Sequence, residues 1–285
     1  TIDEVTYSMN GNQYRVLVGN SEYVDGVTSN VATLTVNKIK VDSSNLSVTT
    51  TEYNGKEQTA NVNGFVEGIM GVTNNTMTNA GTQDVIVSLK DKDNYEWADG
   101  KTEDKKVEWI MEKYDLTNAT LEEIPDQTFT GNEIKPTPVV TVPLPEGSTT
   151  DVTSEVEYTY EANINVGEAT VTVTAKENST NYTGSTSAEF TINEATVEIP
   201  VRPADKTYNK AEQECGIETP ANASVVEGST VKATNAGTYE VEFKLDDPNN
   251  YTWSDGTTEN KVVTWTINKY NLSNATIDRR AHVWT

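Results

Sequence analysis

The feature that most constrains this chain is an internal repeat. The segment 79–114 recurs as 235–270, and every landmark is displaced by 156 residues (235−79, 270−114). The shared landmarks are an Asn-Ala-Gly-Thr tetrapeptide, a Tyr-x-Trp-x-Asp-Gly segment, a second Trp and a final Lys-Tyr pair. A repeat at a fixed spacing indicates an array of copied modules, which restricts the possible folds before any other argument.

A looser copy of the same landmark divides the long period into two modules. Asn165-Val166-Gly167 lies 86 residues after Asn79 and 70 before Asn235 (165−79, 235−165). Modules of this size, here termed type A and type B, are within the usual range for domains. The predicted organisation is the closing part of a domain over 1–38, type A over 39–113, type B over 114–194, type A over 195–269, and the start of a truncated type B module over 270–285.

Two stretches of each type A module alternate apolar and polar residues. Alternate side chains of a strand share one face, so this pattern predicts strands with one buried side, as in an antiparallel sheet. Helical periodicity is nearly absent, and we expect β-sandwiches. The Asp99-Gly100 and Asp255-Gly256 pairs between the two stretches predict hairpin turns. The alternating apolar residues are Val85, Val87, Leu89, Val107, Trp109 and Met111 in the first copy and Val241, Phe243, Leu245, Val263, Trp265 and Ile267 in the second.

Residues 14–36 resemble the last strands of an immunoglobulin-like domain. Tyr14 corresponds to the corner tyrosine of that family, and Val16 occupies the position of the Cys that forms its inter-sheet disulfide. The resemblance implies that 1–38 is the C-terminal part of an immunoglobulin-like domain that lacks this disulfide.

The rest of the chain carries a second resemblance. Phe129-Thr130-Gly131 with the residues up to Pro136, the strand pattern 171–173 after Asn165-Val166-Gly167, and the Tyr-x-Trp-x-Asp-Gly segments recur in a fixed order. Residues 39–269 thus resemble the bacterial immunoglobulin-like repeats found in tandem in secreted and surface proteins of Gram-positive bacteria. The resemblance implies an all-β fold of tandem immunoglobulin-like β-sandwich modules arranged as an elongated array. It also implies an extracellular or cell-surface location.

Composition narrows the possible partners. The 285 residues include 44 acidic and 21 basic side chains, a net charge of −23. Such a charge favours a soluble monomer and disfavours nucleic acid, whose phosphates require clusters of Lys and Arg. The sequence contains no apolar run of about 18 residues, so we expect no membrane span. Host glycan or glycoprotein, or cell-envelope components, are the partners that the resemblance suggests.

Catalytic signals are weak. His282 is the only histidine and lies in the truncated terminal segment, whereas Ser-His-Asp and Cys-His sites need a positioned base. Cys215 is the only cysteine, and we interpret it as a small packed residue. Carboxylate pairs in so acidic a chain are typical of a solvated face. We therefore expect no enzyme activity in this chain and no cofactor.

Two loops contain oxygen ligands that suit calcium. Asp91 and Asp93 precede Tyr95, and Asp246 and Asp247 precede Tyr251 in the second copy. Neither loop has the Gly and Glu of an EF-hand, and Asp, Asn and Pro also build ordinary β-turns. We expect a turn without metal and keep these four residues as calcium candidates.

The tryptophans raise the question of sugar binding. Trp109 and Trp265 share a face with apolar residues and are predicted to lie in the core. Trp97 and Trp253 sit at the shoulder of the predicted hairpin, where they could pack across strands or form exposed platforms for a sugar ring. They are the candidate ligand-binding residues of the sequence.

Three functions stay open at this point. The chain could be a non-catalytic stalk that presents an adhesive or catalytic domain. It could instead be an adhesion or carbohydrate-binding module that acts through loops at one end of a sandwich, and the most divergent loop pair, 65–72 against 222–228, would then be the place to look. The third alternative is an accessory region of a large secreted enzyme.

Overall fold

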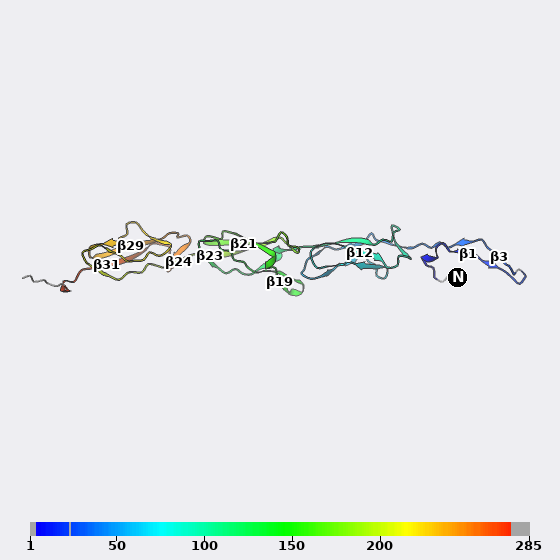
Figure 1. The fold of residues 1–285 in the computed structure, drawn as a ribbon, viewed down its shortest axis with the longest axis horizontal. Helices are drawn as coiled ribbons and strands as arrows, with labels where there is room; N and C mark the ends of the chain where they lie inside the picture. Colours follow the sequence, from blue (N-terminus) through cyan, green and yellow to red (C-terminus); the bar gives the residue numbers. More distant parts are fainter. Residues whose placement is uncertain (1–3, 23, 275–285) are drawn as a thin grey trace, which may run out of the picture. The chain divides into compact units, whose positions relative to one another are not determined.

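The computed structural model describes residues 4–22 and 24–274 and is all-β, as predicted (Figure 1). Strands form small sheets packed as sandwiches, joined by turns and short 3-10 helices. The chain divides into two compact units, and each is considered separately. Unit 1 comprises Thr1–Thr120, Val140–Glu157 and Thr174–Thr186, and unit 2 comprises Leu121–Val139, Tyr158–Val173 and Ser187–Thr285.

Unit 1 begins with two short antiparallel ladders. Strand β1 pairs with β4, and β2 pairs with β3, so residues 13–33 form a hairpin. Apolar side chains on this hairpin are exposed, including Leu17 and Val27. The elements are η1 (Tyr7–Met9), β1 (Gln13–Tyr14), β2 (Leu17–Val18), β3 (Val27–Thr28) and β4 (Ala32–Thr33).

The first predicted type A module, also in unit 1, is built on a sheet of order β10-β12-β14-β7. Strands β12 and β14 are antiparallel and place Val85 opposite Val107. Three two-stranded pairs, β5-β13, β6-β9 and β8-β11, complete it. The strands are β5 (Ile39–Val41), β6 (Ser47–Val48), β7 (Thr51–Glu52), β8 (Gln58–Thr59), β9 (Val62–Asn63), β10 (Met70–Thr73), β11 (Thr76–Met77), β12 (Gly81–Leu89), β13 (Tyr95–Trp97) and β14 (Lys105–Glu112).

The predicted type B module contributes residues to both units. Its strands form a sheet of order β17-β23-β21-β20, a sheet of order β16-β18-β19 and the pair β15-β22. The elements are β15 (Tyr114–Asp115), η2 (Leu116–Asn118), β16 (Thr120–Leu121), β17 (Gln127–Thr128), β18 (Val140–Pro143), η3 (Pro145–Gly147), β19 (Thr149–Asp151), η4 (Thr153–Glu155), β20 (Val156–Glu161), β21 (Gly167–Ala175), β22 (Tyr182–Thr183) and β23 (Ser185–Asn193).

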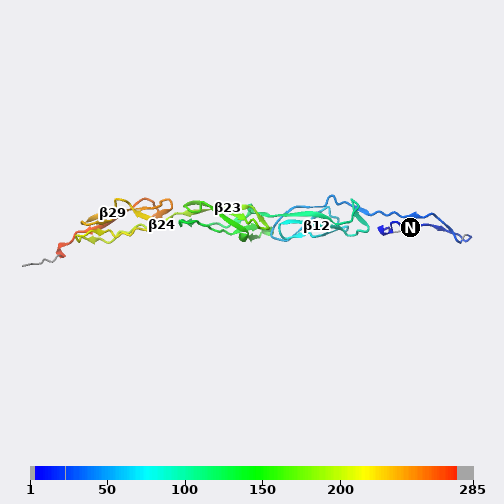
Figure 2. The ribbon, with the colours of Figure 1, turned by 45° about the horizontal axis from the view of Figure 1, so that its top comes forward.

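The second predicted type A module lies in unit 2, where Figure 2 labels its strands β24 and β29. Its main sheet has the strand order of the first, β25-β31-β29-β27. Val241 faces Val263, as Val85 faces Val107. The elements are β24 (Ala195–Val197), β25 (Lys206–Thr207), β26 (Gln213–Glu214), β27 (Ala223–Val225), β28 (Lys232–Ala233), β29 (Gly237–Leu245), β30 (Tyr251–Trp253), β31 (Lys261–Asn268) and η5 (Leu272–Asn274).

The alternating apolar residues are buried, as predicted. In β14, buried and exposed positions alternate, because the pleat sends successive side chains to opposite faces. Trp109 and Trp265 are 0% and 1% exposed and lie in the cores of their modules. Cys215 is also buried, packed in the same core as Trp265.

The two stretches on either side of each Asp-Gly pair form antiparallel partners, β12 with β14 and β29 with β31, but the Asp-Gly turn does not join them directly as a hairpin turn. A tight turn is present, because Gly100 has φ +79° and the N–H of Trp97 donates to the carbonyl of Lys101 at 2.8 Å. However, β13 pairs in parallel with β5, not with β14. The turn therefore carries the chain between two sheets, and the second copy does the same through the parallel β24-β30 pair.

Candidate functional site

Strands β13, β22 and β30 each begin with the Tyr of an Asn-Tyr pair, and the Asn is the last residue of the preceding loop each time. The carbonyl groups of Asn94, Asn181 and Asn250 accept the backbone N–H of Ile39, Tyr114 and Ala195 at 2.8, 2.9 and 3.0 Å. These three donors are the first residues of the predicted modules. We call Asn94, Asn181 and Asn250 the junction asparagines.

The side chains of the junction asparagines bond backbone groups of the preceding predicted module. Within unit 1, Asn94 Oδ1 accepts from the Tyr7 N–H at 3.0 Å, and Asn181 Oδ1 accepts from the Ala80 N–H at 2.9 Å. Within unit 2, Asn250 Oδ1 accepts from the Val166 N–H at 2.9 Å. Ala80 and Val166 are the middle residues of Asn-Ala-Gly and Asn-Val-Gly, so the repeat landmark itself provides the amide.

The orientation of each carboxamide is fixed by the acceptor to which its nitrogen donates a hydrogen bond. The Nδ2 of Asn94 donates to Asp91 Oδ2 at 2.8 Å, and that of Asn250 donates to Asp247 Oδ2 at 2.7 Å. Because only the NH₂ group can donate to a carboxylate, the oxygen must point to the backbone amide. In Asn181 the same nitrogen donates to Asn79 Oδ1 at 3.1 Å.

Aromatic pairs accompany two of these contacts. In unit 1 the Tyr182 ring meets the Tyr53 ring edge-on, with centroids 5.6 Å apart, and in unit 2 Tyr251 meets Phe129 at 5.3 Å. This geometry is the favourable one for aromatic rings. Tyr182 is 6% exposed, and burial raises the pKa of its hydroxyl group, which keeps it neutral.

A lysine adds a further bond at two of the three places. Lys38 Nζ donates to the carbonyl of Lys92 at 2.7 Å, and Lys113 Nζ donates to the carbonyl of Ser179 at 2.6 Å. Each acceptor lies two residues before a junction asparagine. Glu194 stands at the corresponding position before Ala195, so this bond is not available there.

The calcium candidates serve as turn residues. Asp91 Oδ1 accepts from the backbone N–H groups of Asp93 and Asn94, both at 3.0 Å. The hydrogen bonds from Asn94 hold the pKa of Asp91 below its usual value, so its carboxylate stays charged. Asp247 accepts from the Asn249 N–H in the same way, and Asp246 follows strand β29 on an exposed loop.

The described residues, 4–22 and 24–274, hold no group of three or more His, Cys, Asp or Glu side chains placed to bind a metal. His282 lies outside the described residues. Within that same part of the chain, no helix has the length and hydrophobicity that crossing a bilayer requires.

Trp97 and Trp253 are not exposed platforms. Both indoles are 0% exposed, and their Nε1 atoms donate to the carbonyls of Glu103 and Glu259 at 2.7 and 2.9 Å. Their strands lie in the second layer of each sandwich, so these side chains point into the core. A stacked sugar needs an open ring face, and this structure offers none at either residue.

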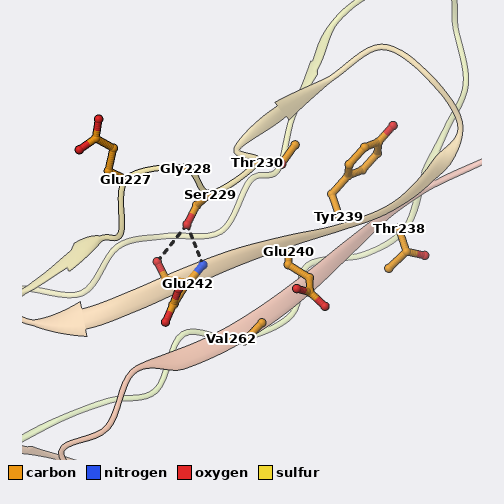
Figure 3. A pocket seen from close by; sticks show the side chains of 9 residues that line it. All are labelled: Glu227, Gly228, Ser229, Thr230, Thr238, Tyr239, Glu240, Glu242 and Val262. Atoms are coloured by element: carbon orange, nitrogen blue, oxygen red, sulfur yellow. Dashed lines mark hydrogen bonds between the residues drawn. The ribbon is translucent and has the colours of Figure 1, made fainter.

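A surface hollow of about 680 Å³ lies beside the divergent loop of the second type A module (Figure 3). Ala223 and Met70 occupy equivalent positions in the two copies. The segment from Ala223 to Asn235 is three residues longer than the segment from Met70 to Asn79 (235−223 against 79−70). The extra length forms the loop at Ser229, whose hydroxyl bonds the backbone of Glu242. The hollow is open and acidic, with the carboxylates of three glutamates, and it lacks the enclosed, mostly apolar character of a small-molecule site.

Sequence reasoning missed the junction asparagines. The loops were interpreted as turns or calcium sites, and only Tyr95 and Tyr251 were used as landmarks. The available signal was the Asn-Tyr dipeptide, which recurs at 94–95, 181–182 and 250–251, with spacings of 87 and 69 residues (181−94, 250−181). These spacings nearly equal the 86 and 70 of the Asn-x-Gly landmark.

Comparison with known proteins finds a family model that matches part of the chain. Residues 117–196 match the MBG domain, a β-rich domain of bacterial surface proteins. The matched range is close to the predicted type B module. No curated protein sequence matches the chain.

Solved structures that resemble the chain include a surface layer protein, a cadherin and a glucan-utilization protein. The surface layer protein SbsC, domains 1–6, is 12% identical with a TM-score of 0.25 over 92% of this chain, which spans 45% of that chain. Drosophila N-cadherin EC1-4 is 11% identical with a TM-score of 0.19, over 91% and 83%. The Bacteroides ovatus glucan-utilization protein SGBP-B, in complex with a mixed-linkage heptasaccharide, is 11% identical with a TM-score of 0.17, over 79% and 67%. At these low scores, no functional argument rests on the likenesses.

Proposed function

We propose that this chain is a non-catalytic spacer, or stalk, of a bacterial surface or secreted multidomain protein. In this role its tandem immunoglobulin-like repeats present an adhesive or catalytic domain, and the chain itself acts as an extracellular monomer. The Gram-positive envelope is the setting that the sequence resemblance favours. The match of residues 117–196 to a domain of bacterial surface proteins supports the location.

The observation that carries the proposal is the recurrence of one bonding pattern. At three places an Asn side chain accepts a backbone N–H of the preceding predicted module, while the backbone carbonyl of the same Asn accepts from the first residue of its own module. A spacer has to limit motion between neighbours, and short links with repeated contacts do so. A catalytic or ligand-binding protein would instead concentrate distinctive residues at one place.

The alternative of a glycan- or glycoprotein-binding module has lost its candidate residues. Trp97 and Trp253, the two aromatic platforms suggested by the sequence, are buried. An accessory role beside a secreted enzyme is compatible with a spacer, since both leave the chemistry to another domain.

Small-angle X-ray scattering of the whole chain tests the proposal. A compact protein of 285 residues has a radius of gyration of about 19 Å, whereas modules linked in series are expected to exceed this value clearly. Replacing all three junction asparagines by Ala should leave the modules folded but broaden the distribution of distances. A radius near 19 Å for the unmodified chain would contradict the stalk, and an unchanged distribution in the triple variant would contradict the role of the asparagines.

A further inference from the structure

The second type A module carries the same contact face that the first uses to hold the type B module. In unit 1 that face consists of Tyr53, Asn79, Ala80 and Lys113, which we call the A1 contact face. The residues at the same positions of the second copy are Tyr208, Asn235, Ala236 and Lys269, the A2 contact face. All four residue types are retained.

The backbone places these residues equivalently. The N–H of Tyr53 donates to the carbonyl of Glu112 at 2.8 Å, and the N–H of Tyr208 donates to the carbonyl of Asn268 at 2.9 Å. The glycine after Ala80 pairs with Met111, and the glycine after Ala236 pairs with Ile267, at the same register of the corresponding sheets. The backbone N–H of Ala236 therefore has the same position relative to its sheet as the backbone N–H of Ala80 has relative to the sheet of the first module.

The two faces differ in what they contact. The Ala80 N–H bonds Asn181 Oδ1, and Lys113 Nζ bonds the carbonyl of Ser179. Among residues 4–22 and 24–274, nothing accepts a hydrogen bond from the Ala236 N–H, and Lys269 is exposed. Tyr208 is half-buried and has no ring partner within this described part of the chain, whereas Tyr53 has one in Tyr182.

The sequence that follows the A2 contact face indicates its occupant. Residues 270–277, Tyr-Asn-Leu-Ser-Asn-Ala-Thr-Ile, copy residues 114–121, Tyr-Asp-Leu-Thr-Asn-Ala-Thr-Leu. In unit 1 the segment after Lys113 opens the module whose Asn181 bonds Ala80. The same entry sequence after Lys269 thus favours a type B module over a type A module.

We propose that the A2 contact face is a binding surface for a type B module. The Asn of its Asn-Tyr loop accepts the Ala236 N–H, Lys269 donates to the carbonyl two residues earlier, and the following Tyr packs edge-on against Tyr208. The surface selects this partner by one backbone amide, one lysine and one ring. This proposed interaction does not depend on the chain serving as a spacer.

A graft tests the proposal directly. In the whole chain, residues 278–285 are replaced by a copy of residues 122–194, so that the copied entry sequence continues into a complete type B module. Amide hydrogen exchange at Ala236 is then measured by NMR, with Ala80 in the same molecule as internal reference. We expect exchange at Ala236 to slow by about tenfold or more, because a new hydrogen bond must open before exchange.

Control variants separate this surface from general stabilisation. The change Asn181→Ala made only in the grafted copy should return Ala236 to its original exchange rate. Lys269→Ala should weaken the protection partially. Unchanged exchange at Ala236, while the grafted copies of Val171 and Val173 are protected, would overturn the proposal.

Two other outcomes also count against it. A graft that stays unfolded after residue 277 would do so, since the same sequence folds next to the A1 contact face. Concentration-dependent protection of Ala236 in the unmodified chain would show that a second copy, not a type B module, occupies the surface.

Discussion

Asn250 offers the sharpest test of the junction contacts, because both the oxygen and the nitrogen of its carboxamide form hydrogen bonds. Oδ1 accepts from the Val166 N–H at 2.9 Å, and Nδ2 donates to Asp247 Oδ2 at 2.7 Å and to Asn165 Oδ1 at 3.3 Å. The residue is 7% exposed, so water cannot easily replace these partners. Any substitution must leave at least one of them without its bond.

Two substitutions of Asn250 separate the donor from the acceptor. Asn250→Ala removes both ends and leaves the Val166 amide unpaired, which should cost about 2–4 kcal/mol from one orphaned amide and the lost bond to a carboxylate. Asn250→Asp keeps the size and the acceptor but removes the donor. It also sets a second carboxylate against Asp247, so we expect a larger loss than for Ala at neutral pH.

The pH dependence gives the Asn250→Asp test its direction. Two charged carboxylates in contact repel each other. One of them in the folded variant therefore has a pKa above the usual value of about 3.9. A raised pKa in the folded state means that stability is present at low pH and is lost as pH rises. The variant should therefore lie closer to the unmodified protein at about pH 4 than at pH 7.

Urea unfolding at both pH values, followed by NMR signals at Val166 and in β29 and β31, measures these differences. Asn249 provides the matched control, since it is exposed and its described contact is a backbone N–H to Asp247. Asn249→Asp should change stability little. If Asn250→Asp is within about 0.5 kcal/mol of the unmodified protein at pH 7, or loses more at pH 4, the carboxamide does not act as described.

Two further predictions concern the module around β31. Trp253→Ala should cost about 3–5 kcal/mol, as much as Trp265→Ala, because both indoles are fully buried and each donates a hydrogen bond to a backbone carbonyl; urea denaturation would show a wrong assignment if Trp253→Ala were nearly neutral. Lys261 lowers the pKa of Asp255 to about 2, so the stability this pair provides is complete above pH 3.8 and is lost as pH falls towards 2. Acid titration of Asp255→Asn should therefore show a smaller loss over that range than the unmodified chain, and equal losses would contradict the pairing.

The core strands could be predicted because period-2 alternation is a local property. Val85, Val87 and Leu89 must share a face in any strand that contains them, whatever that strand pairs with. Trp97 could not be placed in this way, since β13 has only three residues before a turn. Its burial depends on the parallel pairing of β13 with β5, which brings Trp97 next to Val41, 56 residues earlier (97−41). An Asp-Gly pair identifies a turn but not whether the chain returns to the same sheet.

The junction asparagines illustrate a different limit. Turn chemistry correctly explains Asp91 and Asp247, whose carboxylates accept the backbone N–H groups that follow them. The same carboxylates also hold the Asn nitrogen, which leaves the Asn oxygen directed away from its own turn. An acceptor so directed needs a donor from elsewhere, and no local rule identifies it. For Asn181 and Asn250, two landmarks that recur with nearly equal spacings, Asn-Tyr and Asn-x-Gly, do identify the donor, because a contact formed between neighbouring modules constrains both partners.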